Sequence, residues 1–207
     1  ELASECFAGL KARRRNLAGR TGCGLCGAES LQQAIGAPKT VATAALPVAA
    51  AIETALQQLG EHQALQALTG AVHGAALCDA NGAIVLLRED VGRHNALDKL
   101  IGAVFGAPES AARSLIGQGA VAQPDSCPGF ALISSRASYE MVSKCCAAGI
   151  STLVAVSAPT ALAVDYARQA GLNLIGFARP SRHVVYHQAS LPDLAQNISL
   201  PQEGGEP

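Results

Sequence analysis

Tryptophan is absent from this chain of 207 residues, and aromatic side chains make up only 3% of it. A core of such a composition is built mainly from alanine, leucine, valine and isoleucine, as is ordinary for an α/β protein. The sequence also lacks any run of about 18 apolar residues, and it lacks the hydrophobic region of a signal peptide near its N-terminus. These absences favour neither a membrane span nor secretion, so we expect a cytoplasmic protein.

A large excess of one charge is missing as well. The formal net charge is −1, which argues against a protein that binds nucleic acid over its whole surface. Residues 11–20 are a local exception, because they carry five positive charges and no negative ones. This basic run is compatible with a phosphate-bearing ligand. We expect neither nucleic acid nor a membrane among the partners.

Cysteine is plentiful but shows no paired framework. The seven residues are Cys6, Cys23, Cys26, Cys78, Cys127, Cys145 and Cys146. Their odd number and uneven spacing favour a reducing compartment over a disulfide scaffold. Free thiols are therefore available for chemistry.

Cys23 and Cys26 lie in a glycine-rich segment, Arg20–Gly27, that follows the basic run directly. Its three glycines give a flexible loop that presents sulfur to its surroundings. If the basic run lies near the thiols in space, its charges favour thiolate, the nucleophilic and sulfur-accepting form. We therefore interpret this Cys-x-x-Cys segment as the functional centre of the chain.

Two other interpretations of the cysteine pair remain open. A closed structural zinc site needs four ligands, and the chain has no second Cys-x-x-Cys or paired-histidine motif. Cys145 and Cys146 are poor substitutes, because adjacent helix residues point about 100° apart. A thioredoxin-type dithiol follows a strand in a βαβ unit, which residues 1–22 do not provide. We expect no bound metal, and a zinc-stabilised interaction domain stays an alternative.

Periodicity organises the middle of the chain. Apolar residues recur every three or four positions after Pro47, which predicts a helix that Gly60 interrupts, with a shorter helix after it. Two apolar runs, Ala71–Cys78 and Ala83–Arg88, flank an Asn-Gly pair, which is the signal of an antiparallel hairpin. A further helix is expected over Arg93–Phe105.

Strands alternate with helices in the C-terminal half, where each helix begins after serine or threonine and ends at glycine. The strands are expected at Phe130–Ile133, Ile150–Val156, Leu172–Phe177 and Val184–His187, and the helices at Ala137–Ala148 and Ala161–Ala170. Such alternation implies right-handed crossovers and parallel strands. We predict an α/β fold, a three-layer α/β/α sandwich in which an antiparallel hairpin is followed by a parallel βαβαβ arrangement.

Three segments are expected along the chain. Residues 1–40 form a basic N-terminal arm that carries the Cys-x-x-Cys loop and a helix over Glu5–Asn16. Residues 41–190 form the α/β domain, with a loop over residues 106–128. Residues 191–207 form a disordered tail.

Ligands of such sheets collect at the carboxyl ends of the strands and at helix N-termini. Four segments occupy these places: Arg88–Asn95, Ser134–Arg136, Ser157–Thr160 and Phe177–Arg182. Their arginines offer forked donors that match phosphate oxygens, so we expect a nucleotide or another phosphorylated ligand. For the first segment a structural interpretation is equally good, in which Asp90 caps a helix and Arg93 is solvated surface.

Four long stretches resemble one protein family. They are RTGCGLCG (20–27), REDVGRHNALDKLIG (88–102), SSRASYEMV (134–142) and VAVSAPTALA (154–163). In this order they closely resemble motifs of the FdhD family, the formate dehydrogenase accessory sulfurtransferases, and they cover most of residues 11–187. The resemblance implies a cytidine-deaminase-like fold, in agreement with the hairpin and the crossovers.

The resemblance also implies a function. Members of the family accept sulfur as a persulfide from a cysteine desulfurase and pass it to the molybdenum cofactor of formate dehydrogenase, in its bis(molybdopterin guanine dinucleotide) form. By motif position Cys23 is the expected persulfide carrier, with Cys26 as its partner. The residues expected to bind the cofactor are Phe177, Ala178, Arg179, Pro180, Ser181 and Arg182, with Arg136, Arg93 and His94. The expected partners are the desulfurase, the catalytic subunit of formate dehydrogenase and a second copy of the chain.

The chain departs from the family in two respects. The family usually carries a β-rich segment before the cysteine motif, whereas only 22 residues precede Cys23 here. The segment His73–Ala75 lacks the acid of the deaminase His-x-Glu motif, and no Pro-Cys-x-x-Cys follows, so deamination is disfavoured. A non-catalytic, cofactor-binding chaperone for formate dehydrogenase stays an alternative to sulfur transfer.

Overall fold

The structure, a computed structural model, describes residues 37–106 and 129–189. All of these residues from Pro38 onward belong to one structural unit. The Cys-x-x-Cys loop, the expected helix over residues 5–16, the expected loop after residue 106 and the C-terminal tail lie outside the described residues. The predictions made for them, and the predicted domain boundaries, stay predictions.

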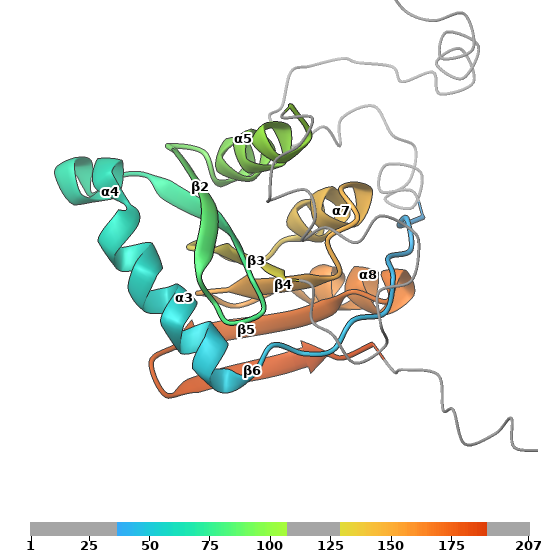
Figure 1. Cartoon of the computed structure of the whole chain (residues 1–207). Coiled ribbons are helices and arrows are strands. Elements are labelled where there is room, and N and C mark those ends of the chain that lie inside the picture. The colour runs from blue at the N-terminus through green and yellow to red at the C-terminus, as the bar shows by residue number, and fades with distance from the viewer. Residues whose placement is uncertain (1–36, 107–128, 190–207) are drawn as a thin grey trace, which may run out of the picture. The chain divides into compact units, whose positions relative to one another are not determined.

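A six-stranded sheet forms the centre of the structure (Figure 1). Its strands are β1 (His73–Cys78), β2 (Ile84–Asp90), β3 (Phe130–Ile133), β4 (Thr152–Ala155), β5 (Asn173–Arg179) and β6 (Arg182–His187), in the spatial order β2-β1-β3-β4-β5-β6. Strand β1 pairs antiparallel with β2 and β3, the strands β3, β4 and β5 run parallel, and β6 returns antiparallel to β5. The prediction of a hairpin followed by parallel strands is confirmed.

Helices cover both faces of the sheet. One face carries α3 (Ala49–His62), and the other carries α5 (Arg93–Gly106), α7 (Tyr139–Ala147) and α8 (Ala161–Ala170), as Figure 1 shows; the short helix α4 (Ala64–Thr69) follows α3. The predicted three-layer α/β/α sandwich is therefore confirmed.

The helix α3 is held to the sheet by an apolar stripe. Its buried residues are Ala51, Ile52, Ala55 and Leu59, and they form one cluster with alternate residues of the strands, among them Ala76, Leu132 and Val154. Alternation along a strand sends the intervening side chains, such as Ile133 and Leu153, to the opposite face, where they are also fully buried. Each large apolar side chain buried in this way stabilises the fold by roughly 1.5–3 kcal/mol.

The hairpin turn between β1 and β2 is fixed from two sides. The Asp79 carboxylate accepts hydrogen bonds from the backbone N–H groups of Asn81 and Ala83, both at 2.9 Å. Gly82 adopts a positive φ of 86°, and a Cβ there would lie 1.9 Å from the carbonyl oxygen of Ala51 on α3. The Asn-Gly pair therefore does more than turn the chain, because its glycine lets the turn dock on the first turn of α3.

Two helices differ from the prediction by more than one residue. Helix α3 continues through Gly60 and ends at His62, because an exposed glycine inside a helix costs only about 1 kcal/mol and the apolar stripe outweighs that cost. Helix α7 begins at Tyr139 instead of residue 137. Ala137 is held in an extended bridge to Pro159, which keeps it out of the helix.

The side chain of Asn173, at the start of β5, joins three separate parts of the chain. It is fully buried. Its Nδ2 donates to the carbonyl oxygen of Ala44 at 2.8 Å and to the hydroxyl of Thr152 at 3.1 Å, while its Oδ1 accepts from the backbone N–H of Ala189 at 2.8 Å. One amide thereby connects the segment that leads into α3, the start of β4 and the chain after β6.

We expect Asn173→Ala to lower the free energy of unfolding by about 3 kcal/mol, because it leaves buried polar groups of three segments without partners. Urea denaturation of the two chains measures the difference. Asn81→Ala is the matched control, because its side chain is exposed in the hairpin turn, and we expect a change within about 0.5 kcal/mol. Equal stabilities of the two variants would contradict the role assigned to Asn173.

Two glycines offer a second test. Gly60→Ala should raise the free energy of unfolding by up to about 1 kcal/mol, because alanine favours the helix and the new Cβ meets nothing within 4 Å. Gly82→Ala should lower it by about 2 kcal/mol or more, because the positive φ and the contact with Ala51 both oppose a side chain. Thermal melting measures both variants, and a stabilising Gly82→Ala would show that the turn does not dock on α3 as described.

Candidate functional site

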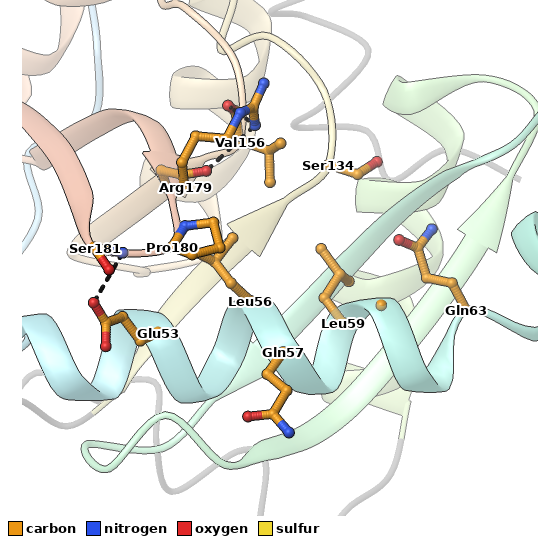
Figure 2. Close-up of a pocket in the computed structure, with 12 residues that line it drawn as sticks. Glu53, Leu56, Gln57, Leu59, Gln63, Ser134, Val156, Arg179, Pro180 and Ser181 are labelled. Atoms are coloured by element: carbon orange, nitrogen blue, oxygen red, sulfur yellow. Dashed lines mark hydrogen bonds between the residues drawn. The ribbon is translucent and has the colours of Figure 1, made fainter.

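A cavity of about 620 Å³ lies between α3 and the carboxyl ends of the parallel strands (Figure 2). Helix α3 and the residue after it contribute Glu53, Leu56, Gln57, Leu59, Gly60 and Gln63. The strand ends contribute Ser134 after β3, Val156 after β4, and Ala178, Arg179, Pro180 and Ser181 at the turn from β5 to β6. A cavity of this size, with apolar walls and a few polar groups, is typical of a small-molecule site. It lies at the sheet edge at which the topology predicts ligands.

Arg179 is the cationic residue in the wall of the cavity. Its side chain is exposed, and its Nη1 donates to the carbonyl oxygens of Val156 at 2.5 Å and Ala178 at 3.3 Å. These hydrogen bonds hold Nη1 of the guanidinium next to the residue that follows β4. An anchored guanidinium loses little further freedom when its remaining N–H groups bind an anion.

The turn that carries Arg179 has an unusual backbone. Phe177 and Ser181 adopt positive φ values of 50° and 63°, a conformation that costs non-glycine residues about 1–3 kcal/mol and is found most often at functional sites. The backbone N–H of Ser181 donates to the Glu53 carboxylate at 3.0 Å (Figure 2). Helix α3 therefore holds the turn in the shape that lines the cavity.

The predicted cofactor segment reaches the cavity only in part. Ala178, Arg179, Pro180 and Ser181 line it. Phe177 instead packs near the ring of Tyr186, with the ring centroids 6.4 Å apart, and Arg182 is exposed where β6 begins. Arg179 and Arg182 are paired across the turn from β5 to β6. Of these two arginines, Arg179 lines the cavity and Arg182 does not.

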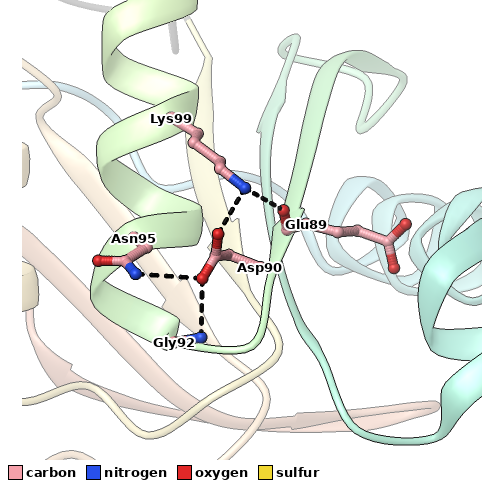
Figure 3. Close-up of polar contacts among 5 residues, drawn as sticks. All are labelled: Glu89, Asp90, Gly92, Asn95 and Lys99. Carbon is pink, nitrogen blue, oxygen red and sulfur yellow. Dashed lines mark hydrogen bonds and ion pairs between the residues drawn. The ribbon is translucent and has the colours of Figure 1, made fainter.

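The segment before α5 forms a separate polar cluster (Figure 3). The Asp90 carboxylate accepts from the backbone N–H of Gly92 at 3.0 Å and from Asn95 Nδ2 at 3.1 Å, and it pairs with Lys99, whose Nζ also donates to the carbonyl oxygen of Glu89 at 3.2 Å. The hydrogen bond from Lys99 is the largest of the causes that lower the pKa of Asp90 to about 2. Asp90 thus ties the turn to the first two turns of α5 through the side chains of Asn95 and Lys99, whereas the backbone N–H that it binds belongs to Gly92, before the helix.

Glu89 has a structural role that the sequence analysis missed. Its two carboxylate oxygens accept from the backbone N–H groups of Leu65 and Gln66, each at 2.9 Å. These are donors of the first turn of α4, which have no partner within the helix. The chain separation of 23 and 24 residues explains why local sequence patterns could not reveal this contact.

The remaining residues expected to assist the cofactor do not line the cavity. Arg93 and Arg136 are exposed. His94 is partly buried. Its burial is the main cause that lowers its pKa, and the nearby positive charge of Arg93 is the second cause. Their assignment as cofactor ligands stays a prediction.

The thiols of the described region are buried. Burial raises the pKa of Cys78 to about 12 and that of Cys146 to about 11, and it raises the pKa of Cys145 well above its ordinary value. Such thiols remain protonated near neutral pH and are poor nucleophiles. Cys23 and Cys26 lie outside the described residues, so their predicted role is neither supported nor opposed by the geometry.

Within residues 37–106 and 129–189, His, Cys, Asp and Glu nowhere form a group of three or more that could hold a metal ion. Within the same ranges, no helix has the length and apolar character needed to cross a bilayer.

Comparison with known proteins identifies relatives along nearly the whole chain. Residues 1–191 match the family described as the FdhD/NarQ family. A protein of Cupriavidus necator named sulfur carrier protein FdhD is 52% identical over 198 residues, which cover 92% of this chain and 64% of that protein. A protein of the same name from Bordetella petrii is 49% identical, covering 90% of this chain and 62% of that protein. The chain thus spans less than two thirds of the length of these two relatives.

A solved structure agrees with the sequence comparison. The chain resembles a protein of Desulfotalea psychrophila that was assigned as a formate dehydrogenase accessory protein, with a TM-score of 0.60 and 27% sequence identity. The similarity covers 74% of this chain and 58% of that one. Sequence and fold thus lead to the same conclusion: the chain belongs to the FdhD/NarQ family.

Proposed function

We propose that the chain is a sulfur carrier, which takes persulfide sulfur from a cysteine desulfurase and delivers it to the bis(molybdopterin guanine dinucleotide) cofactor of formate dehydrogenase. Membership of the FdhD/NarQ family and the name of its relatives support the carrier role. The structural observation that carries the proposal is the cavity at the strand ends, because four of the nine residues expected to bind the cofactor line it.

The cofactor enters this proposal as the substrate. Its guanine nucleotide portions carry phosphates, and the free N–H groups of the anchored Arg179 guanidinium match phosphate oxygens. The apolar side chains of Leu56, Leu59 and Val156 offer surface to a ring system. The cavity would hold the nucleotide end, which leaves the metal end of the cofactor free to meet the cysteine loop.

The sulfur steps follow from thiol chemistry. The thiolate of Cys23 attacks the outer sulfur of the persulfide on the donor, the donor cysteine leaves as a thiolate, and Cys23 then holds the transferred sulfur as a persulfide. Attack by the Cys26 thiolate on Sγ of Cys23 breaks the persulfide bond and releases the outer sulfur as sulfide for the substrate metal. A Cys23–Cys26 disulfide remains, and a cellular dithiol must reduce it before the next cycle.

Labelling tests the carrier step. After incubation with a cysteine desulfurase and cysteine, we expect mass spectrometry to show one added sulfur on Cys23 that a thiol reductant removes. Cys23→Ala should carry no such sulfur and should not restore formate dehydrogenase activity in a strain without its accessory factor. Cys145→Ala is the control, because this thiol is buried with a raised pKa. A Cys23→Ala chain that still restores activity would instead support the non-catalytic chaperone.

Binding of GDP tests the proposed site. Arg179→Ala should weaken GDP binding about tenfold or more, since it removes charge-assisted hydrogen bonds to phosphate. Arg168→Ala is the matched control, because Arg168 is exposed on α8 and pairs with Asp165. Isothermal titration calorimetry on the 207-residue chain measures both. Equal losses in the two variants would show that the guanidinium of Arg179 is not part of the site.

A further inference from the structure

The turn from β5 to β6 carries a backbone donor that the hairpin itself does not use. Pro180 and Ser181 are its two central residues, between the paired residues Arg179 and Arg182. Proline keeps φ at about −65°, whereas Ser181 adopts a φ of 63°. A positive φ at the second central residue alone is the pattern of a type II turn, and the hydrogen bond that closes such a turn joins its first and fourth residues. The N–H of Ser181 is therefore left for an acceptor outside the hairpin.

That acceptor is a carboxylate. Glu53 on α3 accepts from the backbone N–H of Ser181 at 3.0 Å, and both residues are exposed and line the cavity (Figure 2). Short hairpins prefer turns of the primed types, whose twist matches that of the strands, so the contact supports a turn that is otherwise unfavourable. It also places a negative charge on the cavity wall at the point where the proposed ligand needs a donor.

Arg179 keeps its positive charge unpaired beside this contact. Its Nη1 donates to backbone carbonyl oxygens, and the ion pairs found in the described part of the chain do not include it. A guanidinium and a backbone N–H are both donors that bind phosphate oxygens. Arg179 and Ser181 lie two residues apart in one wall of the cavity, so the turn offers two donors to an anion, and Glu53 occupies one of them.

We propose that Glu53 is an internal competitor of the ligand, whose carboxylate binds the N–H of Ser181 until a phosphate group takes its place. The inference rests on the proposed function and concerns the regulation of the same site. Carboxylate and phosphate oxygens accept the same hydrogen bond, and two neighbouring anions repel each other, so they cannot share the turn. The competitor lowers the affinity for the ligand, which favours its release, and it supports the turn once the site is empty.

Glu53→Gln tests the competition. The glutamine amide keeps an oxygen acceptor for the N–H of Ser181 but carries no charge, so the turn retains its support while the repulsion disappears. By calorimetric titration of the 207-residue chain, we expect pyrophosphate and GDP to bind about three- to tenfold more tightly to the variant than to the parent chain. A glutamate that only positions the turn would give the opposite sign or no change, and either result would overturn the inference.

Glu61→Gln is the matched control, because it makes the same change of charge on the same helix. Glu61 is exposed, accepts from Gln57 Nε2 at 3.0 Å and does not line the cavity. We expect unchanged affinities for pyrophosphate and GDP. Equal tightening by both variants would overturn the inference, because it would show an effect of net charge instead of competition at the turn.

Nuclear magnetic resonance of the isotope-labelled chain follows the exchange of acceptors directly. Saturation with pyrophosphate should shift the resonances of both the Ser181 amide and the Glu53 carboxylate carbon, because the hydrogen bond between them is broken. An unmoved Glu53 resonance at saturation would overturn the inference, while binding that still depends on Arg179 keeps the proposed site. Failure of both the parent chain and Glu53→Gln to bind pyrophosphate and GDP overturns the site and the inference together.

Discussion

The buried amide of Asn173 is the constraint on which the cavity depends. It satisfies its hydrogen bonds with Ala44, Thr152 and Ala189, and Ala44 lies in the segment that enters α3. The position of α3 relative to β4 and β5 is therefore fixed by a directional contact as well as by its apolar stripe. Because α3 forms one wall of the cavity and the ends of β4 and β5 belong to the other, this polar contact connects the elements that carry the two walls.

Much of the fold could be predicted from local patterns. The Asn-Gly pair predicted the hairpin, and Thr160 and Gly171 predicted the ends of α8. Thr160 and Gly171 act as caps in the structure: the Thr160 hydroxyl accepts from the backbone N–H of Ala163 at 3.2 Å, and Gly171 adopts a φ of 70°. The sheet edge that gathers ligands was also predictable, because parallel strands end on the same side. What failed depended on tertiary contacts. Packing of α3 on the sheet overrides the low helix propensity of Gly60, and the bridge to Pro159 delays the start of α7.

Only those parts of the candidate site that charge and strand order indicate could be predicted from the sequence. Arg179 was found because an arginine at a strand end is a local signal. Glu53 was missed, because nothing in its neighbours along the chain indicates that its carboxylate reaches a turn 128 residues away. The motif at residues 88–102 shows the converse. Glu89 and Asp90 are used to cap α4 and to tie the turn before α5, so residues within a family motif can serve the fold.

The burial of the described thiols has a chemical consequence for the proposed transfer of sulfur. Sulfur exchange requires a second sulfur to approach along the axis of the bond that breaks, and Cys78, Cys145 and Cys146 have no open side for such an approach. Their raised pKa values also keep them protonated. Sulfur carried in the proposed cycle would therefore not be lost to these three thiols by side reactions.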